Sequence, residues 1–215
     1  MHKKVLLVLV VVVFTASYAQ AQFNFGVRGG VGLTNVYQKK DGEMKVLDYK
    51  PGFQIGIITE YALLDFLFLQ PGISFSRQGM KTEMSISKNS ANFTWDLNYI
   101  QVPINIQIRN NSSKLYLQAG PYFGYGISGK LKVKAVSGGT TDSATEKITF
   151  GGKGTKVTDF NAFDFGVGVG TGFRFGNLQT GLEINYGFVN ITTSKDVTMK
   201  NLGLALTVAY MFGKK

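Results

Sequence analysis

Large apolar residues alternate with small or polar residues over most of the chain, with the two-residue period of a β-strand rather than the 3.6-residue period of a helix. Segment 163–175 shows this plainly, because phenylalanine, valine and one threonine fill the odd positions while aspartate, glycine and arginine fill the even ones. The pattern recurs and predicts eight strands, in segments 23–33, 53–61, 66–78, 95–109, 115–127, 163–175, 178–188 and 201–212.

Three features of these segments predict departures from regular pairing. Pro71 indicates an edge strand or a bulge, because proline donates no hydrogen bond to a ladder. Leu97 and Tyr99 lie out of phase with the isoleucines that follow, which predicts a bulge near Tyr99. Beyond residue 127, alternating lysines predict a longer strand paired with 147–150. Such a protruding hairpin is either an edge to which a partner adds a strand or a passive extension.

The connections between the predicted strands alternate in length. Short turns at one end and long loops at the other are typical of outer-membrane barrels, with the turns in the periplasm and the loops outside. An even number of strands then returns both ends of the barrel to the periplasmic side. Short connections are expected at 62–65, 110–114 and 176–177, and long polar ones at 35–50, 79–94, 128–158 and 189–200.

Alternation alone does not say which face lies inside, so a secreted lipocalin-like barrel competes with a membrane barrel. The composition of the polar phase favours the membrane barrel over the lipocalin-like one. This phase consists mostly of glycine, glutamine, asparagine and serine, with no lysine in the centre of a strand. Such residues suit a narrow lumen, where glycine makes room for a few large polar groups. The predicted fold is therefore an all-β, eight-stranded antiparallel up-and-down transmembrane β-barrel with short periplasmic turns and long extracellular loops.

Aromatic residues gather at both ends of the predicted strands. Membrane barrels carry such girdles at the two interfaces, although cross-strand aromatic pairs in a soluble sheet give a similar pattern. The girdle on the loop side is predicted to contain Phe75, Tyr99, Tyr125, Phe163, Tyr186 and Phe188, and that on the turn side Phe23, Tyr61, Phe175, Tyr210 and Phe212.

The first 21 residues have the order of a secretory signal: Lys3 and Lys4, an apolar run over 5–14, and a small-residue stretch that ends at Ala21. The apolar run is about ten residues long, whereas a spanning helix needs roughly 20, so a retained anchor is the weaker interpretation. We expect cleavage after Ala21 and one barrel domain over 22–215, integral to the cell outer membrane.

The composition excludes several classes of site. The only histidine, His2, lies in the predicted signal, and the chain has no cysteine. Ser-His-Asp hydrolysis, histidine-assisted acyl transfer and His/Cys metal sites therefore lack a required group, and no stretch completes a nucleotide-binding motif. We expect no enzyme activity, cofactor or metal, although carboxylate pairs leave glycosidase chemistry as a minor alternative.

The charge distribution points away from nucleic acid. The chain has 23 basic and 13 acidic residues and a net charge of +10, but its lysines lie in or beside the polar connections rather than on one face. Lysines near the membrane surface are candidates for binding lipopolysaccharide phosphates, although a merely solvated loop set fits equally well. The candidates are Lys39, Lys40, Lys130, Lys132 and Lys134.

Charged residues of the polar phase are predicted to form an ion-pair cluster inside the lumen, namely Arg28, Glu60, Asp164, Arg174 and Glu183. Counted from the periplasmic strand ends, Arg28 and Glu183 lie at similar depth, as do Glu60 and Arg174, so these are the expected pairs. Eight strands enclose only enough space for side chains. A lumen filled in this way is not expected to conduct.

Four motifs occur in order along the chain: FQIG at 53–56, LQPGI at 69–73, YIQVPI at 99–104 and AGPYFG at 119–124. Together they resemble the PorT-like outer-membrane β-barrel family of Bacteroidetes, small barrels of the OmpA/OmpX type, over essentially the whole mature chain. The resemblance implies an eight-stranded outer-membrane barrel; some members are linked to protein secretion, and most have no assigned activity. The short D-[ST]-x pattern at 142–144 makes Ser143 a candidate for the O-glycosylation of such bacteria.

Three kinds of function remain open on the sequence. The first is a non-enzymatic barrel, monomeric and in contact with outer-membrane lipid and lipopolysaccharide, that is structural or accessory to a secretion or assembly complex. The second is a surface adhesin or receptor that binds a ligand through long extracellular loops. An enzyme or a substrate-conducting channel is the least supported.

Overall fold

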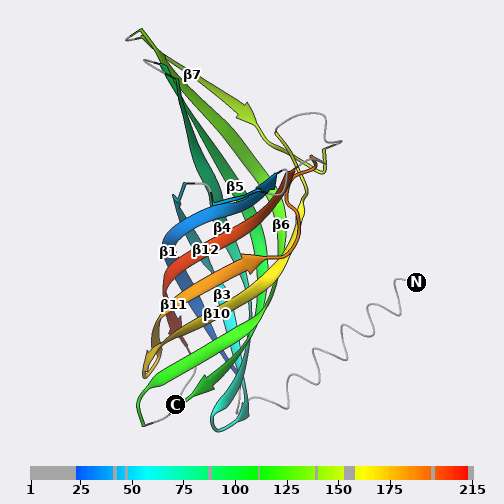
Figure 1. The fold of residues 1–215 in the computed structure, drawn as a ribbon. Helices are drawn as coiled ribbons and strands as arrows, with labels where there is room; N and C mark the ends of the chain where they lie inside the picture. Colours follow the sequence, from blue (N-terminus) through cyan, green and yellow to red (C-terminus); the bar gives the residue numbers. More distant parts are fainter. Residues whose placement is uncertain are drawn as a thin grey trace, which may run out of the picture.

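The computed structural model describes residues 23–40, 43–46, 48–86, 89–110, 112–138, 140–152, 158–194 and 197–212. The predicted secretory signal over 1–21 lies outside the described residues. Over the described part, one sheet closes on itself as a barrel of strongly tilted strands (Figure 1). No helix long and apolar enough to cross a membrane occurs in this part of the chain.

Eight antiparallel strands form the closed ring, and each pairs with the strand before and after it. The first strand pairs with the last and closes the ring. In order, the strands are β1 (Phe23–Lys40), β3 (Lys50–Leu64), β4 (Leu67–Ile86), β5 (Asn89–Arg109), β6 (Leu115–Ser137), β10 (Phe163–Phe175), β11 (Leu178–Gly187) and β12 (Val197–Met211). The predicted eight-stranded up-and-down barrel is confirmed.

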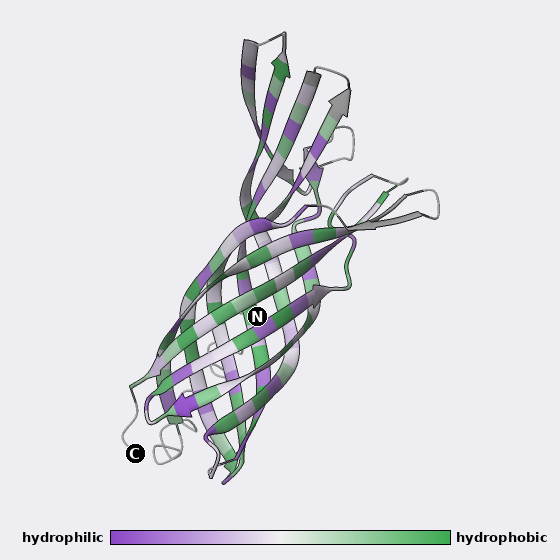
Figure 2. Ribbon diagram, turned by 60° about the vertical axis from the view of Figure 1, so that its left-hand side comes forward, coloured by the Kyte–Doolittle hydropathy of each residue, from purple (hydrophilic) through white to green (hydrophobic). Residues whose placement is uncertain are grey.

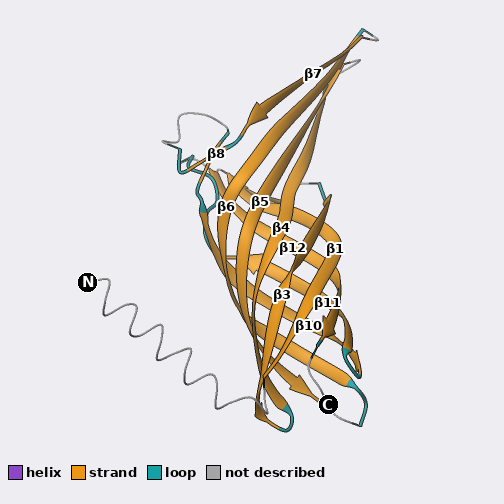
Figure 3. Cartoon of the chain, turned by 180° about the vertical axis from the view of Figure 1, so that it is seen from behind, coloured by secondary structure: helices purple, strands orange, loops and turns teal. Residues whose placement is uncertain are grey.

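The two ends of the barrel differ. At the turn end, tight connections join β3 to β4, β5 to β6 and β10 to β11. At the hairpin end, β4, β5 and β6 rise beyond the ring together with β7 (Thr140–Lys147), as Figure 3 shows from behind. The long loops predicted over 79–94 and 128–158 are thus largely strand. Polar residues at alternate positions suit a sheet solvated on both faces, and composition alone does not distinguish such a sheet from a loop.

Shorter strands of the described chain lie around the hairpin end. β2 (Glu43–Val46) pairs with β1, and β7 pairs with β6. β8 (Thr149–Phe150) and β9 (Asp159–Phe160) form a separate parallel pair. The predicted partner of the β6 extension, 147–150, is therefore only partly right, because Lys147 pairs with Lys130 but Thr149 pairs with Asp159.

The wall of the barrel separates an apolar outside from a polar inside. Hydrophobic residues alternate with small or hydrophilic ones along the strands on the near side of the barrel (Figure 2). On the outside, Val31 and Leu206 are 64% and 65% exposed. On the inside, glutamine, asparagine and charged side chains are buried. This arrangement is that of a protein whose outer wall faces lipid.

The pairing of β5 with β6 shifts register between Asn98 and Tyr99, which confirms the bulge predicted there. The extra residue lies on β6, because Asn98 pairs with Ser128 and Tyr99 with Gly126. Tyr99 has the same inward phase as Gln101, and its side chain is fully buried, so its predicted place in the outer aromatic girdle is wrong. An apolar cluster surrounds it at the hairpin end of the lumen, made of Val36, Met80, Leu97, Tyr99, Ile148, Phe160 and Ile191.

Pro71 makes no bulge. The pairing of β4 with β5 keeps one register from Pro71 opposite Ile104 to Ser74 opposite Gln101. Pro71 and Pro103 lack backbone donors, so they interrupt the ladder without adding a residue to either strand.

Candidate functional site

Glu60 is the centre of a charged cluster at the turn end of the lumen. Its side chain on β3 is 2% exposed and forms ion pairs with Arg109 on β5 and Arg174 on β10. Arg109 donates to both carboxylate oxygens, and Arg174 Nη1 lies 3.0 Å from each of them. Gln70 Nε2 on β4 donates a further hydrogen bond of 2.7 Å. Gln179 Nε2 on β11 donates a longer hydrogen bond of 3.4 Å, so one carboxylate ties five strands together across the lumen.

A second cluster lies deeper in the barrel, where Arg28 on β1 forms an ion pair with Glu183 on β11. Glu183 also accepts hydrogen bonds from Gln118 Nε2 on β6 at 3.0 Å and from Asn185 Nδ2 at 2.9 Å. Both side chains of the ion pair are largely buried, with 12% of Arg28 and 8% of Glu183 exposed. The structure therefore brings together both pairs expected from the sequence.

Gln107 connects the two clusters. Its Nε2 lies 3.2 Å from Gln118 Oε1 and 3.3 Å from Gln70 Oε1, and its Oε1 accepts from Arg109 Nε at 2.5 Å. Arg109 was not among the predicted lumen residues. It shares the inward phase of Gln107, two residues earlier, so strand parity was the signal that would have found it.

Asp164 joins neither arginine cluster. It lies near the hairpin end of β10, where its carboxylate accepts hydrogen bonds from the Tyr122 hydroxyl at 3.1 Å and the Asn201 amide at 2.9 Å. Arg174 lies at the opposite end of the same strand. The phase of a strand predicts whether a side chain points into the lumen, but its partners there also depend on its depth along the barrel. Asp164 therefore points inward as predicted but does not lie in the predicted ion-pair cluster.

Tyrosines on β6 fill the room that glycines leave on β10 and β11. A Cβ at Gly172 would lie 2.7 Å from the Tyr116 hydroxyl oxygen, and a Cβ at Gly181 would lie closer still. A Cβ at Gly166 would lie 2.6 Å from the Tyr122 ring. These glycines are therefore needed for the large side chains that occupy the lumen.

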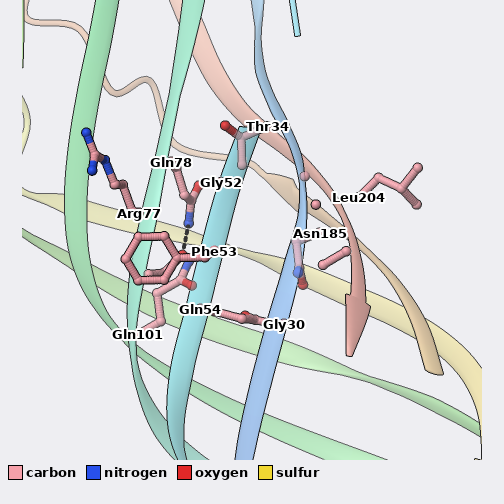
Figure 4. A pocket seen from close by; sticks show the side chains of 14 residues that line it. Gly30, Thr34, Gly52, Phe53, Gln54, Arg77, Gln78, Gln101, Asn185 and Leu204 are labelled. Atoms are coloured by element: carbon pink, nitrogen blue, oxygen red, sulfur yellow. Dashed lines mark hydrogen bonds between the residues drawn. The ribbon is translucent and has the colours of Figure 1, made fainter. Parts of the chain in front are cut away.

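Two small cavities lie between the side chains of the lumen. A cavity of about 40 Å³ is lined by Gly30, Gln54, Gln101 and other residues from several strands (Figure 4). Another of about 30 Å³ lies beside Arg28 and Glu183. Cavities of this size hold a few water molecules.

A third charged group lies on the outer face, where the sheet rises from the barrel. The Asp96 carboxylate on β5 lies 2.7 Å from Lys50 Nζ, 2.9 Å from Arg77 Nη2 and 3.0 Å from Lys132 Nζ. Asp96 and Lys50 are buried, whereas 40% of the Arg77 side chain and 52% of the Lys132 side chain are exposed. Asp96 keeps the outward phase of Val102 on β5, whereas the extra residue on β6 turns Lys132 to the same outer face. The sequence analysis missed this group because it did not place the bulge on β6.

The predicted lipopolysaccharide contacts divide into two groups. Lys130, Lys132 and Lys134 are all exposed and alternate along the extension of β6, on the face that carries the Asp96 group. Lys39 and Lys40 lie at the hairpin end of β1, where their backbone pairs with β12 and β2. The structure therefore gathers the first three on β6 and places the other two on a different strand, β1.

A family model described as the outer membrane protein beta-barrel domain matches residues 18–193 of the chain. The matched segment contains β1 to β11. Among curated proteins, none matches the chain.

Several solved structures are similar in fold. The attachment invasion locus protein Ail of Yersinia pestis has 18% identity and a TM-score of 0.41, covering 89% of this chain and 99% of that chain. Neisserial surface protein A has 14% identity and a TM-score of 0.48, covering 87% and 97%. OprG from Pseudomonas aeruginosa has 13% identity and a TM-score of 0.37, covering 90% and 97%. Similarity at this level says nothing of activity or ligand.

Proposed function

Because this chain belongs to the outer membrane protein β-barrel domain family, we propose that it is a non-enzymatic, monomeric barrel with a filled lumen, structural or accessory to a secretion or assembly complex. Its turn end faces the periplasm, its hairpin end faces the outside, and its apolar wall contacts outer-membrane lipid. The resemblance to the PorT-like family, some of whose members are linked to protein secretion, supports the accessory role.

The filled lumen is the observation that carries this proposal. Glu60 and its two arginines cross-link the wall at the turn end, and the apolar cluster around Tyr99 fills the hairpin end. Between them, the cavities of about 40 and 30 Å³ are too small to pass a nutrient-sized solute. Barrels with an open aqueous channel have about 16 to 18 strands. The function therefore belongs to the surfaces of the molecule rather than to a passage through it.

The extended sheet is the surface best suited to a partner. All residues of β7 are exposed, and among the described strands β7 pairs with β6 alone. Its other edge presents backbone donors and acceptors to which a strand of a second protein can add. Such an edge is a fixed docking element on a barrel that is itself anchored in lipid.

Conductance in planar bilayers tests the filled lumen. We expect no steady current from the purified wild-type protein, because the ion-paired side chains and the apolar cluster around Tyr99 occupy the lumen. A porin inserted under the same conditions is the positive control. A stable porin-like conductance from wild type would overturn the proposal.

Photo-crosslinking tests the accessory role. A photoreactive residue at Thr141 or Thr145 on β7 is expected to capture outer-membrane or secretion proteins in native membranes. The same residue at Val169, which is 52% exposed on the lipid-facing wall, is the matched control. Products found equally at both positions would contradict a partner surface on the sheet.

The length of the sheet also favours a second candidate, a surface adhesin or receptor. β6 has 23 residues, whereas a strand needs only about 9–11 to cross a membrane. The excess places a rigid sheet outside the cell. Crosslinks from β7 to extracellular ligands, rather than to membrane or secretion proteins, would favour this candidate over the accessory role.

A further inference from the structure

Two open grooves meet at Asp96 on the outer face of the sheet, directly beyond the apolar wall. The larger, of about 820 Å³, runs from β1 and β3 to Lys132 on β6. The smaller, of about 440 Å³, continues from Arg77 across β6 to Lys147 on β7. Asp96, Arg77 and Lys132 line both, so the two grooves form one surface.

The surface carries a large excess of positive charge. Asp96 is the single carboxylate among the lining residues, which therefore carry a net charge of +5. Its cationic lining residues are Lys50, Arg77, Lys81, Lys130, Lys132 and Lys147. Two further carboxylates flank Lys81, since Asp48 pairs with its backbone and Glu83 lies two residues on along β4. The excess is therefore concentrated around Arg77 and Lys132.

Strand register holds these cations together. Asp96 lies opposite Gly79 on β4 and opposite Lys130 on β6, and Lys130 lies opposite Lys147 on β7. The Asp96 carboxylate fixes Lys50, Arg77 and Lys132 within 3.0 Å of its oxygens. Because Arg77 and Lys132 are partly exposed, their remaining N–H groups are available to a second anion. Charge-assisted hydrogen bonds from such preorganised cations bind phosphate well.

The same groove also has an apolar part on the lipid-facing wall. Its lining includes Leu33, Phe53 and Leu206, which are 44%, 42% and 65% exposed. Arg77 lies opposite Phe53, and Lys50, Lys81 and Lys132 lie further toward the hairpin end of their strands. The charged part of the groove therefore begins beside the apolar part and continues beyond it. This order matches an amphiphile with its acyl chains along the wall and its phosphate toward the outside, and a soluble phosphate would leave the apolar part unused.

We infer that this surface is a binding site for the phosphorylated headgroup of an outer-leaflet lipid, with Arg77 and Lys132 as the principal phosphate ligands. Lys50, Lys81, Lys130 and Lys147 supply the surrounding positive potential, and Asp96 orients the cations. The site goes beyond the general attraction of loop lysines to an anionic leaflet, because it assigns a defined groove. It depends on the orientation of the barrel and not on the partner proposed for β7.

Lipid titration of the purified protein in neutral detergent, followed by native mass spectrometry, tests this site. The probes are lipid A, dephosphorylated lipid A and sodium pyrophosphate. The double variant Arg77→Gln/Lys132→Gln removes the principal ligands. The control Lys114→Gln/Lys200→Gln removes the same charge at two positions that line neither groove. A shift in mobility between unheated and heated gels shows that each variant is folded.

We expect the Arg77→Gln/Lys132→Gln variant to bind lipid A at least about ten-fold more weakly than wild type, because two charge-assisted hydrogen-bonding groups are lost. The control variant should stay within about two-fold of wild type, and dephosphorylated lipid A should bind as weakly as the double variant binds lipid A. Equal losses in both variants would show only general charge attraction and overturn the site. Pyrophosphate binding as tight as that of lipid A would identify a soluble anion instead. Lipid binding that persists while β7 yields no crosslink would refute the partner proposal alone.

Discussion

Inside the lumen, the single carboxylate of Glu60 forms ion pairs with two arginines. Glu60 receives Arg109 and Arg174, and the surplus positive charge is met by neutral acceptors. Arg109 Nε donates to Gln107, and Arg174 Nε donates to the Gly176 carbonyl at 2.9 Å. Such sharing matters because an unpaired charge is costly to bury.

The pairing of Arg28 with Glu183 predicts non-additive effects of mutation. We expect Arg28→Ala and Glu183→Ala each to reduce the free energy of unfolding by about 2–4 kcal/mol, because each leaves a largely buried charge without its partner. The double variant should lose clearly less than the sum, since neither charge is then left alone. Urea unfolding in detergent measures all three. Strictly additive losses would show that the two charges do not interact.

The packing of Tyr116 predicts unequal effects for two glycine substitutions on neighbouring strands. Gly181→Ala should destabilise the barrel by about 1–3 kcal/mol, because the new methyl group overlaps the Tyr116 hydroxyl and lies 2.9 Å from the Thr171 carbonyl. Gly203→Ala on β12 is the matched control, since a Cβ there meets nothing within 4 Å. The two variants should differ in urea unfolding. Equal stability of the two would contradict a tightly filled lumen.

Single residues also show which features of the lumen could be predicted from the sequence. Strand phase placed Arg28, Glu60, Arg174 and Glu183 inside, because a charge on the lipid face costs about 2–4 kcal/mol at mid-depth. Phase did not give the depth of Asp164, which hydrogen-bonds Tyr122 instead of an arginine. Depth depends on the tilt and stagger of whole strands, which no local pattern encodes.

At the scale of elements, the strands differ greatly in length. β11 has 10 residues, close to a single membrane crossing, whereas β4, β5 and β6 have 20, 21 and 23. The cores of these strands were predictable from alternation, because one face meets lipid and the other a filled lumen. Their extensions were not, because a sheet with solvent on both faces has no fixed apolar phase. Only the alternating lysines of β6 predicted that a strand continues beyond the ring.

Because the extension lies outside the ring, shortening it should leave the barrel intact. Replacing residues 133–144 with Asn-Gly joins Lys132 to Thr145, which already lie opposite each other, through a two-residue turn. The free energy of unfolding in urea should change by less than about 1 kcal/mol, while crosslinking of the remaining β7 residues to a partner should be lost. A variant that no longer folds would show that the hairpin is part of the barrel's core.

The whole molecule has a definite polarity, with tight turns at one end and the charged sheet at the other. The closed ring leaves no strand edge within the lipid-facing wall, as a membrane span requires. The sequence predicted this polarity from the lengths of the connections. The same polarity places every cation of the Asp96 surface at the hairpin end.

Amine labelling of whole cells tests the orientation. A reagent that cannot cross the outer membrane should modify Lys134, which is exposed on the β6 extension, and spare Lys114, which is exposed in the turn before β6. Permeabilised cells, in which both lysines should react, are the control. Labelling of Lys114 but not Lys134 on intact cells would mean that the two ends are exchanged.

The charged extension of β6 also has a consequence for the rate of assembly. During insertion the hairpin end must traverse the hydrocarbon, and moving one lysine through mid-depth costs about 2–4 kcal/mol. Lys130, Lys132 and Lys134 together then raise the barrier by on the order of 6–12 kcal/mol. Insertion without a helper should therefore be slow and should accelerate in thin or defect-rich bilayers, while the finished barrel is no more stable there. The part of the chain that limits how fast the protein enters the membrane is thus the part that contributes least to holding it there.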